Sequence, residues 1–514
     1  MIARRSAPGN AGAIDAADDR GAVAVVMAGG LGTRMRSSVP KLLHPLCGRP
    51  MLSYVVEAAR AATGQAPVVV TSPATAAVRD AFPTGVVFAL QERPDGSGDA
   101  VRAALRAVPA DAAEIVVLNG DIPLVEAGVV TGLLQRRRGA GAAIALVSFE
   151  AWEPGALGRV ILAPEGDRVA RLVEASDATP AELAVSEVNA GMYAFDAAWL
   201  RAAITRLTPS PVTGEYYVTQ LVDLAAADGL VVVTHEVPDD GALDGINDRV
   251  QLAEATAMLR ERINLGWLRA GVTMHDPATA YVDADVDLAP DVTLEPNVML
   301  RGRTRVETGS VIGAGSQLVD SLVGPRCRIW ASVLEQASVE EGTTVGPFSH
   351  LRPGSSIGPD VQLGNFAEVK NSRLERGVKQ HHVSYLGDAH VGAGTNVGAG
   401  TITANYDGVH KHHTEIGEGV FLGVDTMLRA PVTIGDGAKT GAGAVVTRDV
   451  PAGTLAVGVP ARIRELRPPA SSPEPAAAPE QATPLEPAAG AEPGHDAQGG
   501  PGAVAARPPS VADR

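Results

Sequence analysis

Cysteine and aromatic residues are scarce in this chain. Cys47 and Cys327 are the only cysteines among 514 residues. Two cysteines so far apart form neither a disulfide framework nor a zinc-ligand spacing, which favours a reducing compartment. Aromatic residues make up 4% of the chain, whereas glycine numbers 57 and proline 37. This composition predicts a region built from small, regular turns rather than from bulky core layers.

Long apolar runs and an excess of positive charge are also missing. No stretch reaches the roughly 18 uninterrupted apolar residues that a membrane-spanning helix needs, and the first residues lack the apolar segment of a secretory signal. With 43 basic and 59 acidic residues, the formal net charge is −16. Nucleic-acid binders are more often basic. We therefore expect a cytoplasmic protein without membrane insertion and without a nucleic-acid partner.

The first half of the chain alternates between two textures. The length of the whole chain, 514 residues, predicts two or three domains. Alanine-rich helical stretches at 54–62 and 100–107 separate several apolar runs that are typical of buried strands. These runs lie at 22–27, 67–71, 86–90, 115–118, 143–148 and 230–234. The alternation predicts a mainly parallel α/β sheet, with ligands beyond the carboxyl ends of its strands.

The second half has a different period. Apolar residues recur at every sixth position, most regularly at Val339, Val345, Leu351, Ile357, Leu363 and Val369. A period of six fits neither a helix nor a strand, but it fits a solenoid with three flat sides per coil, each pointing one apolar residue inward. Chance periodicity is the alternative, and the unbroken run of six disfavours it. The pattern breaks at 373–385 and 405–414, where we expect insertions to project as loops.

These textures predict the organisation of the chain. Residues 246–270 show helical spacing of Val250, Ala253, Leu259 and Ile263, which indicates a connecting helix. The ends are rich in small and polar residues or in proline and alanine, and cannot bury enough surface to fold. The expected segments are a disordered extension at 1–20, an α/β domain at 21–245, a linker helix at 246–270, a solenoid at 271–467 and a disordered tail at 468–514.

A glycine-rich turn follows the first predicted strand. Gly29, Gly30 and Gly32 would let the backbone approach an anion closely, and Arg34 and Lys41 add positive charge. The pattern is neither a P-loop nor a GxGxxG fingerprint. Further along, Asp121 follows a predicted strand, where a carboxylate suits Mg²⁺. Taken alone, the glycines could also form a plain tight turn, and the aspartate could cap a helix.

Histidines gather in one part of the solenoid. They are His381, His382, His390, His410, His412 and His413. A solvated histidine-rich loop explains such a cluster, and so does a base for proton transfer. A metal site is a weaker explanation, because the spacing is irregular and no cysteine lies nearby.

In order along the chain, several motifs resemble those of a known bifunctional family. MAGGLGTRM, PKLLH, LQERPDGSGDA, NGDIPL, LGR, LVEASDA, EVNAG, GEYYVT and DGINDR resemble the N-acetylglucosamine-1-phosphate uridyltransferase domain. The periodic half resembles the glucosamine-1-phosphate acetyltransferase domain of the same family. The match covers about residues 22–466. It implies a Rossmann-like nucleotidyltransferase domain, a linker helix and a left-handed parallel β-helix of hexapeptide repeats, assembled as a homotrimer.

The resemblance implies two successive reactions. Acetyl would pass from acetyl-CoA to glucosamine-1-phosphate, and uridylyl would then pass from UTP to N-acetylglucosamine-1-phosphate with release of pyrophosphate and with Mg²⁺ as cofactor. Two alternatives remain open. The chain could be a sugar-1-phosphate nucleotidyltransferase with a purely structural β-helix, or a non-enzymatic trimeric scaffold that binds sugar nucleotides.

The resemblance also assigns residues in the first half. Arg34 and Lys41 would stabilise charge during uridylyl transfer, and Asp121 with Asn247 would bind Mg²⁺. Ser97 stands where the family usually has threonine, and Gln220 where it usually has aspartate. The residues implied to contact UTP or UDP-N-acetylglucosamine are Met27, Ala28, Gly29, Gly30, Lys41, Gln91, Gly96, Ser97, Asn119, Gly120, Asp121, Gly158, Glu174, Asn189 and Asn247.

In the second half, the resemblance makes His382 the general base, with Glu368 in support. Val424 stands where serine is usual, and Val459 where a basic residue is usual, although Arg462 is close by. Glucosamine-1-phosphate would be bound by Arg352, Lys370, Tyr385, Asn396 and, from a neighbouring subunit, Lys411. Acetyl-CoA would be bound by Ala399, Asn405, Tyr406, Val424, Ala442 and Val459.

Overall fold

A computed structural model describes residues 21–164, 166, 168–211 and 213–466. The predicted disordered segments at 1–20 and 468–514 lie outside the described residues. Within the described residues, no helix combines the length and the apolar character needed to cross a bilayer.

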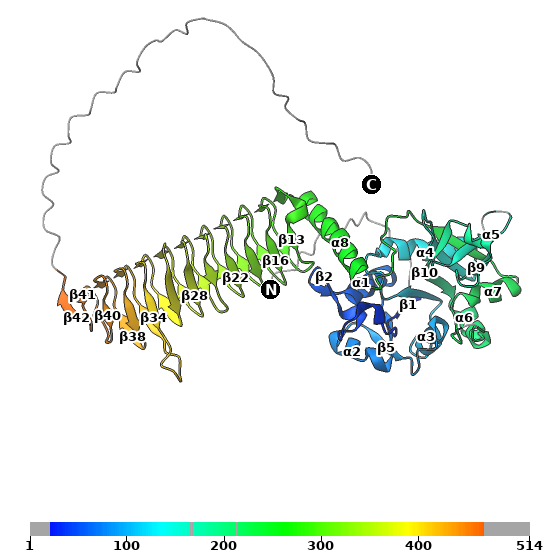
Figure 1. Cartoon of the computed structure of the whole chain (residues 1–514), viewed down its shortest axis with the longest axis horizontal. Helices are drawn as coiled ribbons and strands as arrows, with labels where there is room; N and C mark the ends of the chain where they lie inside the picture. Colours follow the sequence, from blue (N-terminus) through cyan, green and yellow to red (C-terminus); the bar gives the residue numbers. More distant parts are fainter. Residues whose placement is uncertain (1–20, 165, 167, 212, 467–514) are drawn as a thin grey trace, which may run out of the picture. The chain divides into compact units, whose positions relative to one another are not determined.

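The first half forms an α/β sheet (Figure 1). Its four neighbouring strands β6, β1, β4 and β5 run parallel. The strands run in the order β11-β7-β10-β6-β1-β4-β5. Their bounds are β1 (Ala22–Met27), β4 (Val68–Thr71), β5 (Val87–Leu90), β6 (Glu114–Asn119), β7 (Ile144–Glu150), β10 (Glu187–Asp196) and β11 (Val232–Glu236). The six strands expected from the sequence are all present, with ends shifted by at most two residues.

Strand β10 departs from the parallel pattern, because it runs antiparallel to both β6 and β7. The antiparallel hairpin of β8 (Arg159–Leu162) and β9 (Val169–Val173) precedes it. A parallel neighbour would need a crossover connection, and this hairpin takes its place. The prediction of a mainly parallel sheet therefore holds for β6, β1, β4 and β5 and misses β10.

Helices cover both faces of this sheet because its strands are apolar on both sides. In β1, Ala24 and Val26 face one layer, whereas Val23 and Val25 face the other. The first layer contains α1 (Met51–Thr63) and α4 (Ala127–Ala140). The second contains α3 (Ser97–Ala104), α6 (Ala197–Ala203) and α7 (Gln220–Ala227). Two further helices of the first half are short: α2 (Ala77–Ala81) follows β4, and α5 (Pro180–Leu183) follows β9.

The connecting helix is α8 (Arg249–Arg269), close to the predicted span. The side chain of Asp248 caps it by accepting hydrogen bonds from the backbone N–H groups of the second and third residues that follow. The predicted buried stripe was partly wrong, because Val250 is 66% exposed and Ala253 is exposed as well. The buried stripe begins one turn later and includes Leu259 and Trp267.

In the second half, the described strands form three parallel sheets that wind as a left-handed β-helix (Figure 1). We call these sheets the first, second and third faces. They begin with β12 (Thr273–Met274), β13 (Tyr281–Val282) and β14 (Asp287–Leu288), respectively. In a regular coil the pairing partners are 18 residues apart, as in Thr293 with Val311. The residues of the predicted six-residue period are all buried in one core.

The coils that carry the candidate residues occupy the later part of each face. On the first face they are β24 (Thr344–Val345), β27 (Gln362–Leu363), β30 (Lys379–Gln380), β33 (Asn396–Val397), β36 (Phe421–Leu422) and β39 (Lys439–Thr440). On the second face they are β25 (His350–Leu351), β28 (Ala367–Lys370), β31 (Ser384–Gly387) and β34 (Ile402–Ala404). On the third face they are β29 (Arg373–Leu374), β32 (Ala389–Val391) and β35 (Thr414–Ile416).

The two breaks in the period have different causes. At 373–385 the expected insertion is absent: Ser356 pairs with Arg373, only 17 residues on, so a shortened corner shifts the phase. At 405–414 the expected loop is present. Ala389 pairs with Thr414, 25 residues on, and the extra residues project from the column as the yellow hairpin beside β34 (Figure 1).

The inward residues of the period should carry the stability of the β-helix. Leu351 is in phase and fully buried, so Leu351→Ala should lower the free energy of unfolding by about 2–5 kcal/mol. Leu322 precedes an inward position and is exposed, so Leu322→Ala should change it by less than about 0.5 kcal/mol. Urea unfolding of both variants checks this. Equal losses would contradict the assignment of inward positions.

Candidate functional site

The glycine-rich turn follows β1 and is held close to its neighbours. A Cβ atom at Gly29 would lie 2.9 Å from Oε1 of Gln91, and one at Gly32 would lie 2.5 Å from Cβ of Lys41. Gly32 also has a φ of 59°, in the left-handed region. Ser72 Oγ donates a hydrogen bond to the Gly29 carbonyl at 2.8 Å and fixes the turn. These glycines are therefore required by close approach and by backbone conformation.

Two cations and two oxygen ligands meet beside this turn. Lys41, in the short helix η2 (Lys41–Leu43), donates to Asp121 Oδ2 at 2.6 Å and to Asn247 Oδ1 at 3.3 Å. Arg34 Nη2 donates to the same Asn247 oxygen at 2.8 Å. Asp121 follows β6 and Asn247 precedes α8 by two residues. The structure thus brings together four predicted residues from three separate parts of the chain.

This cluster fits a divalent ion that is shared with phosphates. Among the described residues, no three His, Cys, Asp or Glu side chains form a group able to hold a metal alone. Asp121 and Asn247 offer one carboxylate and one amide oxygen, and both lie near the position of a Cβ atom on Gly245. Mg²⁺ prefers such oxygen ligands and usually takes the remainder from water and substrate phosphates. The donor set therefore suits Mg²⁺ in the presence of a nucleotide.

A second group of predicted residues lies together at the β8–β10 edge. Asn189 N donates to the Gly158 carbonyl at 2.9 Å, and a Cβ on Gly158 would lie 3.7 Å from Glu174 Oε2. Tyr193 accepts a hydrogen bond from Asn189 Nδ2 at 2.6 Å, and Thr219 donates to Glu174 at 3.1 Å. Sequence reasoning missed Tyr193 and Thr219, which orient the predicted polar groups.

The other predicted nucleotide contacts lie around the strand ends. Gly120 N donates to the Met27 carbonyl at 3.0 Å, so the residues after β1 and β6 are adjacent. Gln91 is buried and donates from Nε2 to the Gly96 carbonyl at 3.1 Å. Ser97 Oγ accepts a hydrogen bond from Val218 N at 3.0 Å, so the retained hydroxyl already has a backbone partner. Ala28 and Asn119 continue β1 and end β6 at this same edge.

On the second face of the β-helix, parallel register stacks the predicted polar residues. Glu368 pairs with Tyr385 on the next coil, and Arg352 Nη1 donates to Glu368 Oε1 at 3.0 Å. Hydrogen bonding to Lys411, together with the charges of Lys411 and Arg352, lowers the pKa of Lys370. Lys411 therefore lies beside Lys370 within one chain, whereas the resemblance assigned it to a neighbouring subunit. Repelling cations at close range favour an anionic ligand between them.

The corner between the first and second faces carries a pocket. Five predicted residues line it: His382, Asn396, Ala399, Val424 and Ala442. Residues that the sequence did not predict line it too, namely His381, Val397, Gly398, Phe421, Leu422, Gly423, Thr440 and Gly441. The predicted base and much of the predicted acetyl-CoA wall therefore meet in one pocket.

Three residues predicted for acetyl-CoA do not line this pocket. Val459 is 73% exposed, and Tyr406 is exposed on the projecting loop, where its hydroxyl donates to the Gly408 carbonyl. Asn405 is buried and its Nδ2 donates to Asp388 Oδ2 at 2.5 Å. Within one chain, Asn405 thus anchors the base of the loop through Asp388.

The histidine cluster resolves into different roles. His390 Nδ1 donates a hydrogen bond to Glu415 Oε1 at 2.6 Å, and that hydrogen bond raises the pKa of His390. His412 pairs with an aspartate of the projecting loop, and His413 pairs with Glu415. Among the described residues, His382 has no hydrogen-bonded side-chain partner, and its ring lies edge-on to that of His381 with centroids 6.4 Å apart. His382 is therefore free to act on a ligand in the pocket.

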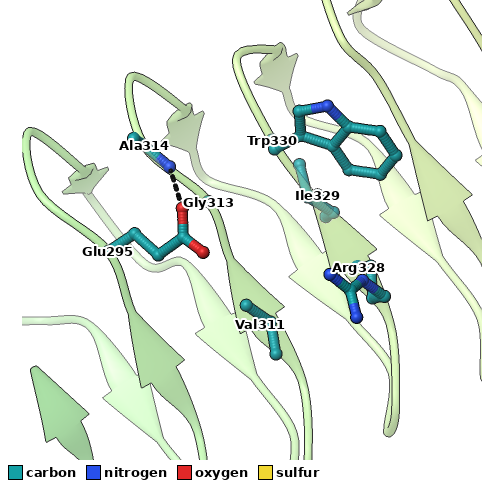
Figure 2. A pocket seen from close by; sticks show the side chains of 7 residues that line it. All are labelled: Glu295, Val311, Gly313, Ala314, Arg328, Ile329 and Trp330. Carbon is teal, nitrogen blue, oxygen red and sulfur yellow. Dashed lines mark hydrogen bonds between the residues drawn. The ribbon is translucent and has the colours of Figure 1, made fainter. Parts of the chain in front are cut away.

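A further hollow lies on earlier coils of the first face (Figure 2). It is lined by Glu295, Val311, Gly313, Ala314, Arg328, Ile329 and Trp330. Glu295 points towards the 313–314 corner and accepts a hydrogen bond from Ala314 N at 2.9 Å. None of the residues predicted for either site is among them.

Comparisons with known proteins match both halves. Residues 24–191 match the MobA-like NTP transferase domain, and residues 413–448 match the bacterial transferase hexapeptide (six repeats). A protein of Kineococcus radiotolerans named "Bifunctional protein GlmU" is 44% identical over 443 residues, covering 85% of this chain and 90% of its own length.

Proteins of the same name from two other bacteria are similar to the chain over nearly as much of it. The one from Pelobacter propionicus is 42% identical over 438 residues, covering 84% of this chain and 95% of that protein. The one from Mycobacterium tuberculosis is 42% identical over 441 residues, covering 84% and 89%, respectively.

Proposed function

The chain belongs to the family of bifunctional GlmU proteins, and from that premise we propose how its two sites divide the family's two reactions. The enzyme acetylates glucosamine-1-phosphate and transfers uridylyl to the product. The proposal assigns uridylyl transfer to the cluster around Lys41 and acetyl transfer to the corner pocket around His382. Both cysteines are free thiols, which supports a cytoplasmic location.

The contact between Lys41 and Asp121 carries the first assignment. A phosphate oxygen of N-acetylglucosamine-1-phosphate attacks the α-phosphorus of UTP, the bond to the leaving oxygen breaks, and pyrophosphate departs. Negative charge grows on the bridging oxygens, and Lys41 and Arg34 stabilise it because they are fixed beside the glycine turn. Mg²⁺ bound by Asp121 and Asn247 would neutralise further phosphate charge. Gly158, Glu174 and Asn189 would hold the sugar.

The pocket carries the second assignment. Arg352, Lys370 and Lys411 form a positively charged group that suits the substrate's phosphate, although Arg352 also donates to Glu368. The amine attacks the thioester carbonyl, the carbon–sulfur bond breaks, and the coenzyme thiolate leaves. His382 accepts the proton that the amine loses, and its unpaired ring is available for that role. Two other possibilities are a structural β-helix and a non-enzymatic scaffold. They are disfavoured because the predicted cluster around Lys41 is assembled and because His382 lines a pocket with Asn396.

A homotrimer is part of the proposal. Phe348, Phe366 and Val383 occupy equivalent places on successive coils at the same corner as the pocket, and Trp330 lies one residue out of that register on the coil before. Phe348 and Phe366 are 58% and 60% exposed, and their rings stack with centroids 5.5 Å apart. A row of exposed apolar side chains is typical of a protein interface. A neighbouring chain on this row would also flank the pocket.

The two activities should separate by mutation. Lys41→Met should reduce pyrophosphate release from UTP and N-acetylglucosamine-1-phosphate at least about 100-fold, because transition-state charge loses its partner. It should leave thiol release from acetyl-CoA and glucosamine-1-phosphate within about twofold. His382→Ala should reduce thiol release at least about 100-fold and spare pyrophosphate release.

Each variant serves as the folding control for the other, since both reactions are measured on the same preparation. Near-normal pyrophosphate release by Lys41→Met would remove Lys41 from the mechanism. Unchanged thiol release by His382→Ala would refute its role as base.

The pH dependence of acetyl transfer should depend on the positive charges beside Lys370. Because Lys411 and Arg352 lower the pKa of Lys370, Lys370 loses its proton and its hold on phosphate at a lower pH than an isolated lysine. Removing one positive neighbour raises that pKa. In Lys411→Met, the alkaline fall of kcat/KM for glucosamine-1-phosphate should therefore move to higher pH, measured by thiol release. Arg303→Met, at an exposed site on an early coil, should leave the fall in place. An unmoved profile in Lys411→Met would contradict the coupling.

The exposed row should hold the assembly together. Replacing Phe348 and Phe366 by glutamate should yield monomers in light scattering, because charges cannot be buried unpaired in an interface. Trp152 is 93% exposed in the first half, and Trp152→Glu should keep the wild-type mass. A double variant of unchanged mass would exclude this row as the interface.

A further inference from the structure

The amide of Gln91 has a fixed orientation. Its side chain is buried, and Nε2 donates to two acceptors at 3.1 Å each, the Gly96 carbonyl and Oδ2 of Asp99. If the amide were turned over, its oxygen would face a carbonyl oxygen and a carboxylate. Both contacts would then be repulsive, since neither partner has a proton to donate. The two acceptors therefore place Nε2 on their side and Oε1 on the other.

The charged acceptor has the stronger influence on this choice. Hydrogen bonds to an ionised group are shorter and stronger than those to a neutral carbonyl. Asp99 is in the first turn of α3, and Arg102 Nη1 contacts its other oxygen, Oδ1, at 3.4 Å. Arg102 in turn lies over the ring of Tyr216, 4.6 Å from its centroid. Arg102 thus contacts the Asp99 carboxylate at Oδ1, while Oδ2 of the same carboxylate accepts the hydrogen bond from Gln91.

The free oxygen of Gln91 faces the glycine turn. A Cβ atom at Gly29 would lie 2.9 Å from Oε1, so this oxygen sits directly over the glycine backbone. Among the described residues, Oε1 accepts no hydrogen bond, although both donor positions of the amide are engaged on the other side. An unpaired acceptor at this place is ready for a donor on a bound nucleotide.

Pyrimidine bases differ in what they offer to such an acceptor. Uracil carries a proton on N3, whereas cytosine has a lone pair there. An oriented acceptor binds the first and repels the second, and a site with a fixed hydrogen-bonding pattern discriminates strongly against a ligand of opposite polarity. An amide that can turn over loses this discrimination, because its NH₂ can serve cytosine.

We propose that Asp99 is a positioning residue that sets the preference for UTP over CTP by locking the Gln91 amide with its oxygen towards the base. This inference rests on the proposed uridylyl transfer and extends it. Asp99 touches neither the nucleotide nor the metal; it acts through Gln91. The uracil contact itself belongs to the family resemblance, and the locking of that contact by a carboxylate in α3 is the new element.

The test compares UTP and CTP as substrates of the full chain. Pyrophosphate release with N-acetylglucosamine-1-phosphate gives kcat/KM for each nucleotide, and thiol release from acetyl-CoA on the same preparation measures intact enzyme. Asp99→Ala should lower the UTP-to-CTP ratio of kcat/KM at least about tenfold. Asp99→Leu should do the same, because leucine cannot accept a hydrogen bond, and its larger side chain fills the space in case the alanine variant folds poorly.

Arg102→Ala is the matched control. It removes the ion pair that Asp99 makes within α3 but leaves the Asp99–Gln91 hydrogen bond, so the ratio should stay within about threefold of wild type. If Asp99 merely anchored the helix, Arg102→Ala and Asp99→Ala would lower the ratio alike, and that result would overturn the proposal. In a Gln91→Leu background, Asp99→Ala should have no further effect on the ratio.

The outcomes separate the two levels of inference. If the wild-type chain releases no pyrophosphate from UTP, the proposed uridylyl transfer fails and this inference fails with it. If the wild-type chain prefers UTP and both Asp99 variants keep that preference, only the positioning role of Asp99 is wrong.

Discussion

Parallel strand pairing in register is the constraint on which both sites depend. In the first half, Met27 pairs with Asn119, so the glycine turn after β1 and Asp121 after β6 must emerge at the same edge. In the second half, His350, Glu368 and Tyr385 occupy equivalent places on consecutive coils. Parallel pairing repeats a position from strand to strand. Parallel pairing therefore places side chains that are distant in the sequence next to one another.

The two sites handle positive charge in opposite ways. Lys41 is neutralised by Asp121 in the free protein, which keeps a half-buried ammonium in place until phosphates arrive. Lys370 has Lys411 and Arg352 as neighbours instead, and its lowered pKa reflects that lack of balance. The first arrangement suits a nucleotide that brings both phosphate and metal, because Asp121 would bind the metal and Lys41 would bind the phosphates. The second suits a substrate that brings negative charge alone.

The sequence predicted the repeating features of the fold well and the singular ones poorly. The six-residue period identified the inward residues of the β-helix because each coil repeats the same burial pattern. Strand β10 was not among the strands predicted from the sequence, so its antiparallel direction was missed as well. The break at 373–385 was taken for an insertion because a shortened corner and a lengthened one both shift the phase of the period. Val250 was misplaced because helical spacing does not show which turn first meets the core.

The candidate sites show the same division. Motif order located the four-residue cluster around Lys41 and five of the residues that line the pocket around His382. Val459, Tyr406 and Asn405 do not reach that pocket, because a resemblance transfers identities and not the local path of an exposed loop. Tyr193, Thr219 and Asp99 were missed for a different reason. Each acts by fixing another side chain. Such a contact depends on proximity in the folded chain, which the spacing of residues along the sequence does not predict.

The corner between the first and second faces joins assembly to chemistry. Its early coils carry the exposed apolar row, and its later coils carry the pocket with His382. A surface that buries the row extends naturally along the corner to the pocket mouth, since the coils are stacked in register. The cluster around Lys41, by contrast, is complete within the first half, because its four residues come from segments packed on one sheet. In the proposed homotrimer, acetyl transfer would take place beside the contact between chains, whereas the four residues proposed for uridylyl transfer come from a single chain.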